Sequence, residues 1–195
     1  HVGDLDNAPT CRALDEAVAH LLHILQVKPA RVAHDLHPDF YSTRLAARLA
    51  GRYDAVLLPV QHHHAHVAAA MLERGWLGRE VLGIAWDGTG YGPDGTVWGG
   101  EFMVASATDY RRVACLRPFA LPGGEAAVRQ PWRVAVSLVY QAVGPVEAAK
   151  LRFEGIAQSE VDCLVQLLRR PRLWPTTSSA GRLFDGVAAL TLSVT

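Results

Sequence analysis

The sequence predicts an α/β fold in which a mixed sheet is flanked by helices. Two observations carry this prediction. Residues 15–60 show helical and apolar strand periods in the order helix, strand, helix, strand, which is typical of a parallel α/β layer. Residues 81–106 contain two β-rich runs around glycine-rich turns, which favours antiparallel pairing. With 195 residues, half of them hydrophobic, the chain can bury one core.

The first half of the chain supplies the parallel layer. Apolar residues recur at helical spacing over residues 15–27, before Lys28-Pro29. Residues 30–35 follow as a buried strand. Residues 43–51 predict a second helix, with Ser42 as its cap and Gly51 as its stop. Residues 54–60 predict a second strand, and a third helix opens directly after it.

The second half mixes strands and helices. The two strands within residues 81–106 are predicted to pair around the Asp94-Gly95 dipeptide. Residues 111–121 predict a third strand of this group. The helical period returns in residues 132–143 and 159–170, and residues 176–190 predict a polar loop that enters a last helix.

Composition narrows the function. Lys plus Arg and Asp plus Glu number 19 each without a basic block, which argues against nucleic acid as the main partner. Cys11, Cys115 and Cys163 form no CxxC pattern, so neither a disulfide framework nor a thiolate zinc site is indicated. No signal pattern and no apolar run of roughly 20 residues is present. We therefore expect a soluble protein of the reducing cytoplasm, with no membrane partner.

Four histidines lie within residues 62–66. His62 and His66 are four apart, so on a helix their Cβ atoms lie about 5–6 Å apart on one face, and both imidazoles can reach one metal ion. His63 and His64 are expected to point elsewhere. The alternative is a polar helix start with solvated histidines. The position after an α/β strand, where ligand sites gather, favours the metal.

Asp87 follows the strand of residues 81–86 and is interpreted as closing it. Its carboxylate can complete a His, His, Asp set that suits iron or zinc with positions left open for substrate. The turn that follows, with Gly88, Thr89 and Gly90, permits close approach of backbone N–H groups to a phosphate. The alternative is an ordinary Asp-Gly hairpin turn.

Asp35 and His37 follow a predicted strand. They are candidates for catalytic contact with substrate, and the alternative is that they cap the following helix.

Two further segments place polar residues at predicted turns. Gly123-Gly124 forms a flexible turn with Arg129 and Arg133 nearby, which can grip phosphate or carboxylate with paired hydrogen bonds or can be ordinary surface arginines. Ser179 and Asp185 lie where a loop enters the last helix. A helix N-terminus favours an anion, although an N-cap with an acidic first turn explains the same residues.

Several long motifs together resemble one known family, the HypF carbamoyltransferases that mature nickel–iron hydrogenases. The motifs occur in the order HVGDLDN, VAHDLHPDFYSTRLA, VQHHHAHVAAAM, DGTGYGPDGTVWGGEF, LPGGEAAVRQPWR and TSSAGRLFDGVAAL. The resemblance implies an actin-like ATPase lobe, also called ribonuclease-H-like, that is threonylcarbamoyl-transferase-like. It also implies that His62 and His66 are the metal-binding pair and Asp87 an aspartate ligand.

The function implied by the resemblance is carbamoyl transfer. Carbamoyl-AMP, made from carbamoyl phosphate and ATP, would donate its carbamoyl group to the C-terminal cysteine of a maturation partner protein. A mononuclear divalent metal, iron or zinc, would be the cofactor. The resemblance also predicts that residues 1–195 are a partial domain, without the family's first hairpin, most of its second lobe and a further aspartate ligand. Weak or absent activity is expected of the fragment.

Two alternatives stay open. One is a metal-binding or partner-docking module without catalysis. The other is a relative that acts on a small-molecule hydroxyl or on a tRNA, as the O-carbamoyltransferases and tRNA threonylcarbamoyl-transferases do. The stretch WDGTGYGPDGTVWGGE is closer to the hydrogenase branch, and the neutral charge disfavours tRNA.

Overall fold

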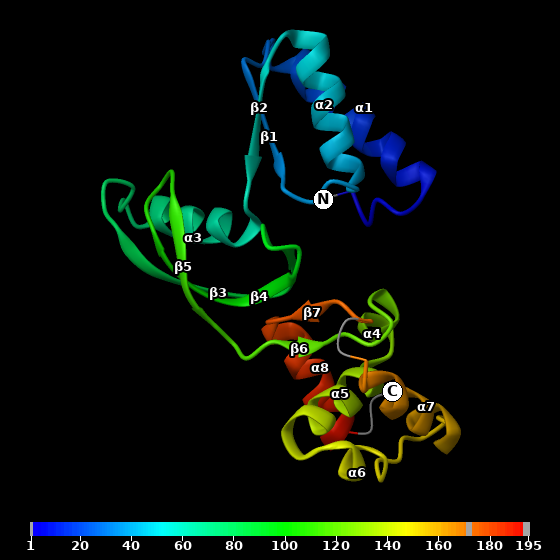
Figure 1. Ribbon diagram of the computed structural model, residues 1–195. Helices are drawn as coiled ribbons and strands as arrows, with labels where there is room; N and C mark the ends of the chain where they lie inside the picture. Colours follow the sequence, from blue (N-terminus) through cyan, green and yellow to red (C-terminus); the bar gives the residue numbers. More distant parts are fainter. Residues whose placement is uncertain (1, 171–172, 193–195) are drawn as a thin grey trace. The chain divides into compact units, whose positions relative to one another are not determined.

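The computed structural model describes residues 2–170 and 173–192 and divides into two compact units (Figure 1). The first unit ends at His62 and the second begins at His63. Within the described residues, no helix is both long and apolar enough to cross a membrane.

The first unit is a small α/β layer. Helix α1 (Ala8–Ile24) precedes strand β1 (Arg31–Asp35), and helix α2 (Tyr41–Tyr53) precedes strand β2 (Val56–Val60). The two strands pair in parallel. Helix α2 contacts both strands and buries the apolar side of its first three turns. The predicted order of elements and the parallel pairing are confirmed.

Three helix boundaries differ from the prediction. Helix α1 begins at Ala8 because the Asn7 side chain caps it, accepting the N–H of Thr10 at 3.0 Å. Helix α2 begins after Phe40, so the prediction that Ser42 is its cap is wrong. The prediction that Gly51 stops this helix is also wrong, because Asp54 adopts the left-handed conformation that ends it.

The second unit opens with helix α3 (His62–Glu73), whose first residue closes the first unit. Strands β3 (Val81–Tyr91), β4 (Val97–Ala105) and β5 (Tyr110–Cys115) form an antiparallel group, as predicted, although the third strand ends at Cys115 and does not continue to residue 121. Helix α3 packs Val67 and Met71 into a core with Ala85 of β3. Gly83 permits this packing, since a Cβ atom there would lie 2.5 Å from Cγ2 of Val67.

Two short strands extend this group into a mixed sheet. Strand β7 (Thr176–Thr177) pairs in parallel with β4, and strand β6 (Phe119–Ala120) pairs antiparallel with β7. The order is β3-β4-β7-β6, with β5 also paired to β4. The predicted mixed sheet is therefore confirmed, although the two short strands were not predicted individually.

The helices that follow the strands in the second unit pack around α5 (Figure 1). Helix α5 (Pro131–Val143) contacts α7 (Gln158–Leu168) and α8 (Ala180–Thr191), which confirms the three predicted helices. Its Trp132, Ala135 and Val136 are buried in their shared core. The short helices α4 (Glu125–Arg129) and α6 (Pro145–Ala148) flank α5 in the chain.

Candidate metal centre

The four histidines in the first turns of α3 differ in burial and in the direction of their rings. His62 is half-buried and His66 is exposed, and helical spacing puts them on the same face. His64 is buried, and its Nε2 lies 2.9 Å from the carbonyl oxygen of Ser106, so it points away as predicted. His63 does not point away. Its Nε2 lies 3.8 Å from Oδ2 of Asp87, which corrects the prediction for this residue.

Asp87 lies within strand β3 and does not close it. The strand continues to Tyr91, and its register against β4 shifts between Trp86 and Gly90. This irregularity is a bulge, a feature that re-aims side chains. Asp87 Oδ1 accepts the N–H of Gly88 at 2.6 Å, and Oδ2 lies 3.7 Å from Nε2 of His66.

One ligand atom each from His62, His66 and Asp87 lie within 4.8 Å of one another. Donors bound to zinc at about 2.0–2.1 Å can be at most about 4.2 Å apart, so small side-chain rotations would close the set around one ion. Two imidazoles and one carboxylate are ligands that zinc and iron both accept, with positions left over. The arrangement fits a mononuclear divalent metal, and these ligands stay a prediction.

Buried His63 explains one of the glycines after Asp87. Its ring packs so closely on Gly90 that a Cβ atom there would overlap the ring, and it also lies against Trp98, with ring centroids 6.1 Å apart. Gly90 is therefore needed for packing against α3. Thr89 is exposed, and the phosphate role predicted for Gly88, Thr89 and Gly90 stays a prediction.

Asp35 lies at the end of β1 and contacts His62. Its Oδ2 is 3.4 Å from His62 Nδ1, and its Oδ1 accepts the N–H of His37 at 2.8 Å. The His37 ring stacks on Phe40 at 4.1 Å, and its Nδ1 accepts the N–H of Asp39 at 3.2 Å. The alternative that Asp35 and His37 cap α2 is wrong, because the N-cap is Phe40 and the helix has no side-chain cap hydrogen bond. Their catalytic contact with substrate stays a prediction.

Ser179 is the N-cap of α8 and contacts the bulge. Its Oγ accepts the N–H of Arg182 at 3.0 Å. The same hydroxyl lies 2.9 Å from the carbonyl oxygen of Asp87 and 2.8 Å from that of Gly88, and it can donate to either. Asp185 pairs with Arg182, with Oδ2 at 2.8 Å from Nε. The predicted loop-to-helix junction is confirmed, while the cofactor-binding role of Ser179 and Asp185 stays a prediction.

The two arginines after the Gly123-Gly124 turn have partners in their own segment. Both glycines adopt positive φ, at 93° and 57°. Exposed Arg129 pairs with Glu125. Arg133 Nε donates to Gln130 at 2.5 Å, and its guanidinium lies over the ring of Trp132. A bound anion would have to replace these contacts, so the predicted anion grip stays a prediction.

A buried carboxylate beside the site was not predicted. Glu101 of β4 is fully buried and accepts hydrogen bonds from Ser178 Oγ, from Arg112 Nε at 2.6 Å, and from the N–H groups of Gly99 and Gly100. Burial opposes its ionisation, but these hydrogen bonds outweigh burial and hold the pKa of Glu101 below its ordinary value. The sequence signal was a lone acidic residue inside an otherwise apolar strand.

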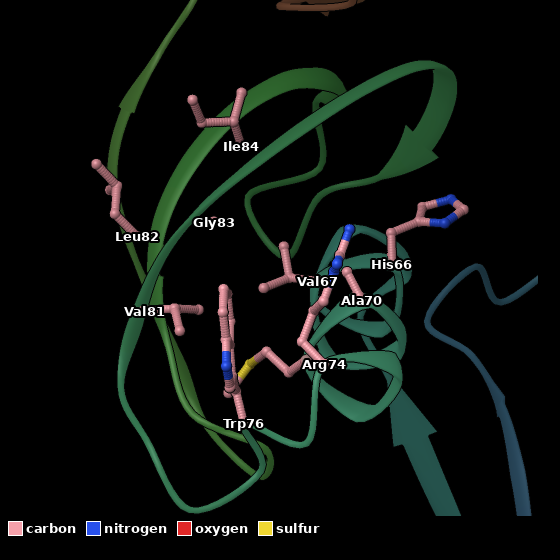
Figure 2. Close-up of a pocket in the computed structure, with 10 residues that line it drawn as sticks. His66, Val67, Ala70, Arg74, Trp76, Val81, Leu82, Gly83 and Ile84 are labelled. Atoms are coloured by element: carbon pink, nitrogen blue, oxygen red, sulfur yellow. The ribbon is translucent and has the colours of Figure 1, made fainter.

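An apolar pocket of about 320 Å³ adjoins the site between α3 and β3. Figure 2 shows His66 at its edge, with the ring directed away from Trp76 and Val81. Neither His62 nor Asp87 lines it. The pocket is therefore not the metal centre.

Comparisons with known proteins place both parts of the chain in one family. The family described as "Carbamoyltransferase, Kae1-like Domain, second subdomain" matches residues 83–194, and that described as "HypF Kae1-like domain" matches residues 1–73. Carbamoyltransferase HypF2 of Cupriavidus necator is 46% identical over 190 residues, covering 97% of this chain and 23% of that protein. Carbamoyltransferase HypF of a Synechocystis species is 41% identical over 208 residues, covering 97% and 26%.

Solved structures of HypF proteins are similar to this chain over the same length. The structure of full-length HypF in its phosphate- and nucleotide-bound form superposes with a TM-score of 0.85 at 37% identity, and covers 97% of this chain and 24% of its own. HypF of T. kodakarensis gives a TM-score of 0.87 at 32% identity, covering 97% and 26%. The chain thus spans about a quarter of the length of these relatives, and its fold is that of their Kae1-like, actin-like lobe. The chain belongs to the HypF carbamoyltransferase family.

Proposed function

We propose that this chain forms the carbamoyl-transferring part of a hydrogenase-maturation carbamoyltransferase. Its relatives are named carbamoyltransferase HypF, and the match covers 97% of the chain. The observation that carries the proposal is the His62, His66 and Asp87 cluster at the turn of α3 and the bulge of β3.

In the proposed reaction, the thiol of a C-terminal cysteine on a maturation partner attacks the carbamoyl carbon of carbamoyl-AMP. A carbon–sulfur bond forms, the bond from that carbon to the phosphate oxygen breaks, and AMP leaves with the electron pair while the thiol loses its proton. The acceptor sulfur comes from the partner. Cys11, Cys115 and Cys163 are free thiols, which suits a reducing cytoplasmic location, and none belongs to the ligand cluster.

His62, His66 and Asp87 would hold the divalent metal, zinc or iron. When bound, such an ion supplies Lewis-acid stabilisation of phosphoryl or carbonyl oxygen. Other residues of the chain would orient the ligands and bind the phosphate. Asp35 faces Nδ1 of His62, the arrangement by which carboxylates orient histidine ligands. Backbone N–H groups near Gly88, and the N-terminus of α8 at Ser179, would face the adenylate phosphate.

Further predicted residues of the second unit are assigned to the proposed nucleotide site, and His37 of the first unit is kept as a separate candidate for contact with substrate. Gly123 and Gly124 supply a turn in positive φ, and Arg129 and Arg133 would exchange their present partners for a phosphate. His37 would contact substrate from the loop after β1. A phosphate- and nucleotide-bound form of the full-length relative supports a nucleotide as ligand.

A chimera tests the proposal. The matching quarter of Synechocystis HypF is replaced by this chain, and the protein is given carbamoyl phosphate, ATP and a peptide that ends in cysteine. We expect mass spectrometry to detect a carbamoylated peptide with the chimera and none with its His66→Ala variant. The unmodified relative is the positive control. An active relative beside an inactive chimera would contradict the proposal, and full activity of the His66→Ala chimera would contradict the role of the cluster.

A further inference from the structure

The backbone of Asp87 and Gly88 is enclosed by the next strand, β4, and by the start of α8, which comes about 90 residues later in the chain. Strand β4 approaches so closely at Gly99 that a Cβ atom there would lie 2.5 Å from the carbonyl oxygen of Asp87. The start of α8 approaches equally closely, since a Cβ atom at Gly181 would lie 2.7 Å from Cα of Gly88. Only residues without a side chain fit at these two positions.

Ser179 supplies the polar contact in this enclosure. It is fully buried, and its hydroxyl is within donating distance of the carbonyl oxygens of both Asp87 and Gly88. Residues in a bulge lack regular ladder partners. The hydroxyl therefore provides a hydrogen bond at the point where β3 leaves its register with β4.

Ser179 is in turn fixed by the buried carboxylate of Glu101. The neighbouring Ser178 donates its hydroxyl to Glu101 Oε1, and Arg112 bonds to both Glu101 and Ser178. Ser178 N–H donates to the carbonyl oxygen of Val97 at 3.0 Å. The junction between β7 and α8 is thus attached to β4 by side-chain and backbone bonds, and it cannot shift independently of the sheet.

We propose that Ser179 is a positioning residue for the metal centre: anchored through Ser178 to Glu101, it holds the Asp87–Gly88 backbone so that the Asp87 carboxylate faces α3. The inference rests on the proposed function, because it gives Asp87 the role of a ligand. It gives Ser179 a role that its side chain performs on the backbone of Asp87 and Gly88, without contact with the metal. Residues that support metal ligands in this way change metal affinity about 10–100-fold when they are lost.

The test compares two buried serines in the 195-residue chain. Ser179→Ala removes the hydroxyl at the bulge. Ser137→Ala is the matched control, because Ser137 is also buried and donates to a backbone carbonyl, that of Ala120, at 2.7 Å. Co²⁺ is titrated into each protein and followed by its visible absorption, and thermal unfolding is measured in parallel. Ser179→Gly is added because glycine is tolerated as an N-cap, which keeps α8 intact.

We expect Ser179→Ala and Ser179→Gly to weaken Co²⁺ binding about 10-fold or more. Ser137→Ala should lower Tm by a similar amount but leave Co²⁺ binding unchanged. If both Ser179 variants bind Co²⁺ with an affinity within about twofold of that of Ser137→Ala, the inference is wrong, while the proposed metal centre still stands. A wild-type chain that binds no Co²⁺ would overturn the metal centre of the proposed function and the inference with it. The two failures are therefore distinguishable.

Discussion

The two sides of the candidate metal centre are built in different ways. On the helix side, His62 and His66 share a face of α3 because they are four residues apart, so local geometry alone brings their rings together. On the strand side, Asp87 lies in a bulge that is enclosed by β4 at Gly99 and by α8 at Ser179. One side is determined by a few neighbouring residues, whereas the other also depends on Ser179, which lies 92 residues after Asp87 in the chain.

Substitutions on the two sides should therefore affect metal affinity and folding stability differently. A change on the helix side removes a ligand and leaves the fold largely intact, because His66 is exposed. A change on the strand side disturbs buried packing first and the ligand second, because Glu101, Ser178 and Ser179 are all buried. Metal affinity and folding stability should therefore separate on the helix side and fall together on the strand side.

The largest effect is expected from His66→Ala. It removes a ligand from an exposed position, so the metal content should fall from near one ion per chain to near none while the free energy of unfolding of the metal-free protein stays within about 0.5 kcal/mol. Elemental analysis after loading with Zn²⁺ and removal of excess measures this. His64→Ala is the control on the same helix, since its ring bonds to Ser106. Equal metal in both variants would refute the ligand role of His66.

Glu101→Gln should cause the largest loss of stability. It removes the charge that pairs with Arg112 at 2.6 Å inside the protein, and breaking a buried ion pair costs about 3–5 kcal/mol. Arg112 keeps some solvent exposure, so we expect the low end of this range. Urea unfolding at neutral pH measures it, with exposed Glu147→Gln as control. Equal unfolding midpoints for Glu101→Gln and Glu147→Gln would show that the charge of Glu101 does not stabilise the fold.

Acid should lower the stability of the wild-type protein more than that of Glu101→Gln. Burial raises the pKa of Glu101, but hydrogen bonds from Ser178, Arg112 and two backbone N–H groups lower it more, so the folded-state pKa lies below the ordinary value of 4.5. Asp94, which also pairs with Arg112, has a lowered pKa for similar reasons. Such groups stabilise the fold fully above their unfolded-state pKa and lose this effect as pH falls through the folded-state pKa. Wild type should therefore lose stability below about pH 4.5 more steeply than Glu101→Gln, and parallel curves would contradict this.

Gly99→Ala should give an intermediate effect on the strand side. The added Cβ atom would lie 2.5 Å from the carbonyl oxygen of Asp87 and 2.9 Å from Cβ of Ser179, so the bulge must move. Overpacking of this kind costs about 1–3 kcal/mol, and we expect Co²⁺ affinity to fall with it. Gly78→Ala is the control, because a Cβ atom at Gly78 meets nothing within 4 Å. Lost stability with unchanged Co²⁺ affinity would separate the bulge from the metal centre.

Asp35→Asn should give the smallest effect. Asparagine keeps the shape of the side chain but removes the charge beside Nδ1 of His62, so the metal affinity should fall about 10-fold, near the low end for such partners. Calorimetric titration with Zn²⁺ measures it, and Asp39→Asn in the same loop is the control. If both variants bind Zn²⁺ equally well, Asp35 does not orient His62.

The sequence predicted what local periodicity determines. The helix, strand, helix, strand order of the first unit, the antiparallel hairpin and the pairing of His62 with His66 all follow from spacing that is visible within a few residues. Even here the ends of α2 were missed, because Phe40 begins it without a side-chain cap and Asp54 ends it in a conformation usually left to glycine.

The strand side could not be predicted in the same way. Asp87 was named as a ligand candidate, but its place in a bulge depends on the register shift of β3 against β4 between Trp86 and Gly90, which no local signal fixes. The structure requires Gly90 for contact with His63, which sequence spacing did not indicate, and its predicted phosphate role stays a prediction. The Glu101 cluster joins residues 77 positions apart, a separation at which sequence spacing carries no geometric information.

The most direct test of the metal centre is X-ray absorption spectroscopy of the Zn²⁺-loaded chain. We expect zinc ligands at about 2.0–2.1 Å that include two imidazole nitrogens, and only one imidazole nitrogen in His62→Ala. Oxygen ligands, including Asp87, should complete the shell. A zinc shell without imidazole, or one that His62→Ala leaves unchanged, would contradict the assignment of His62, His66 and Asp87 as ligands.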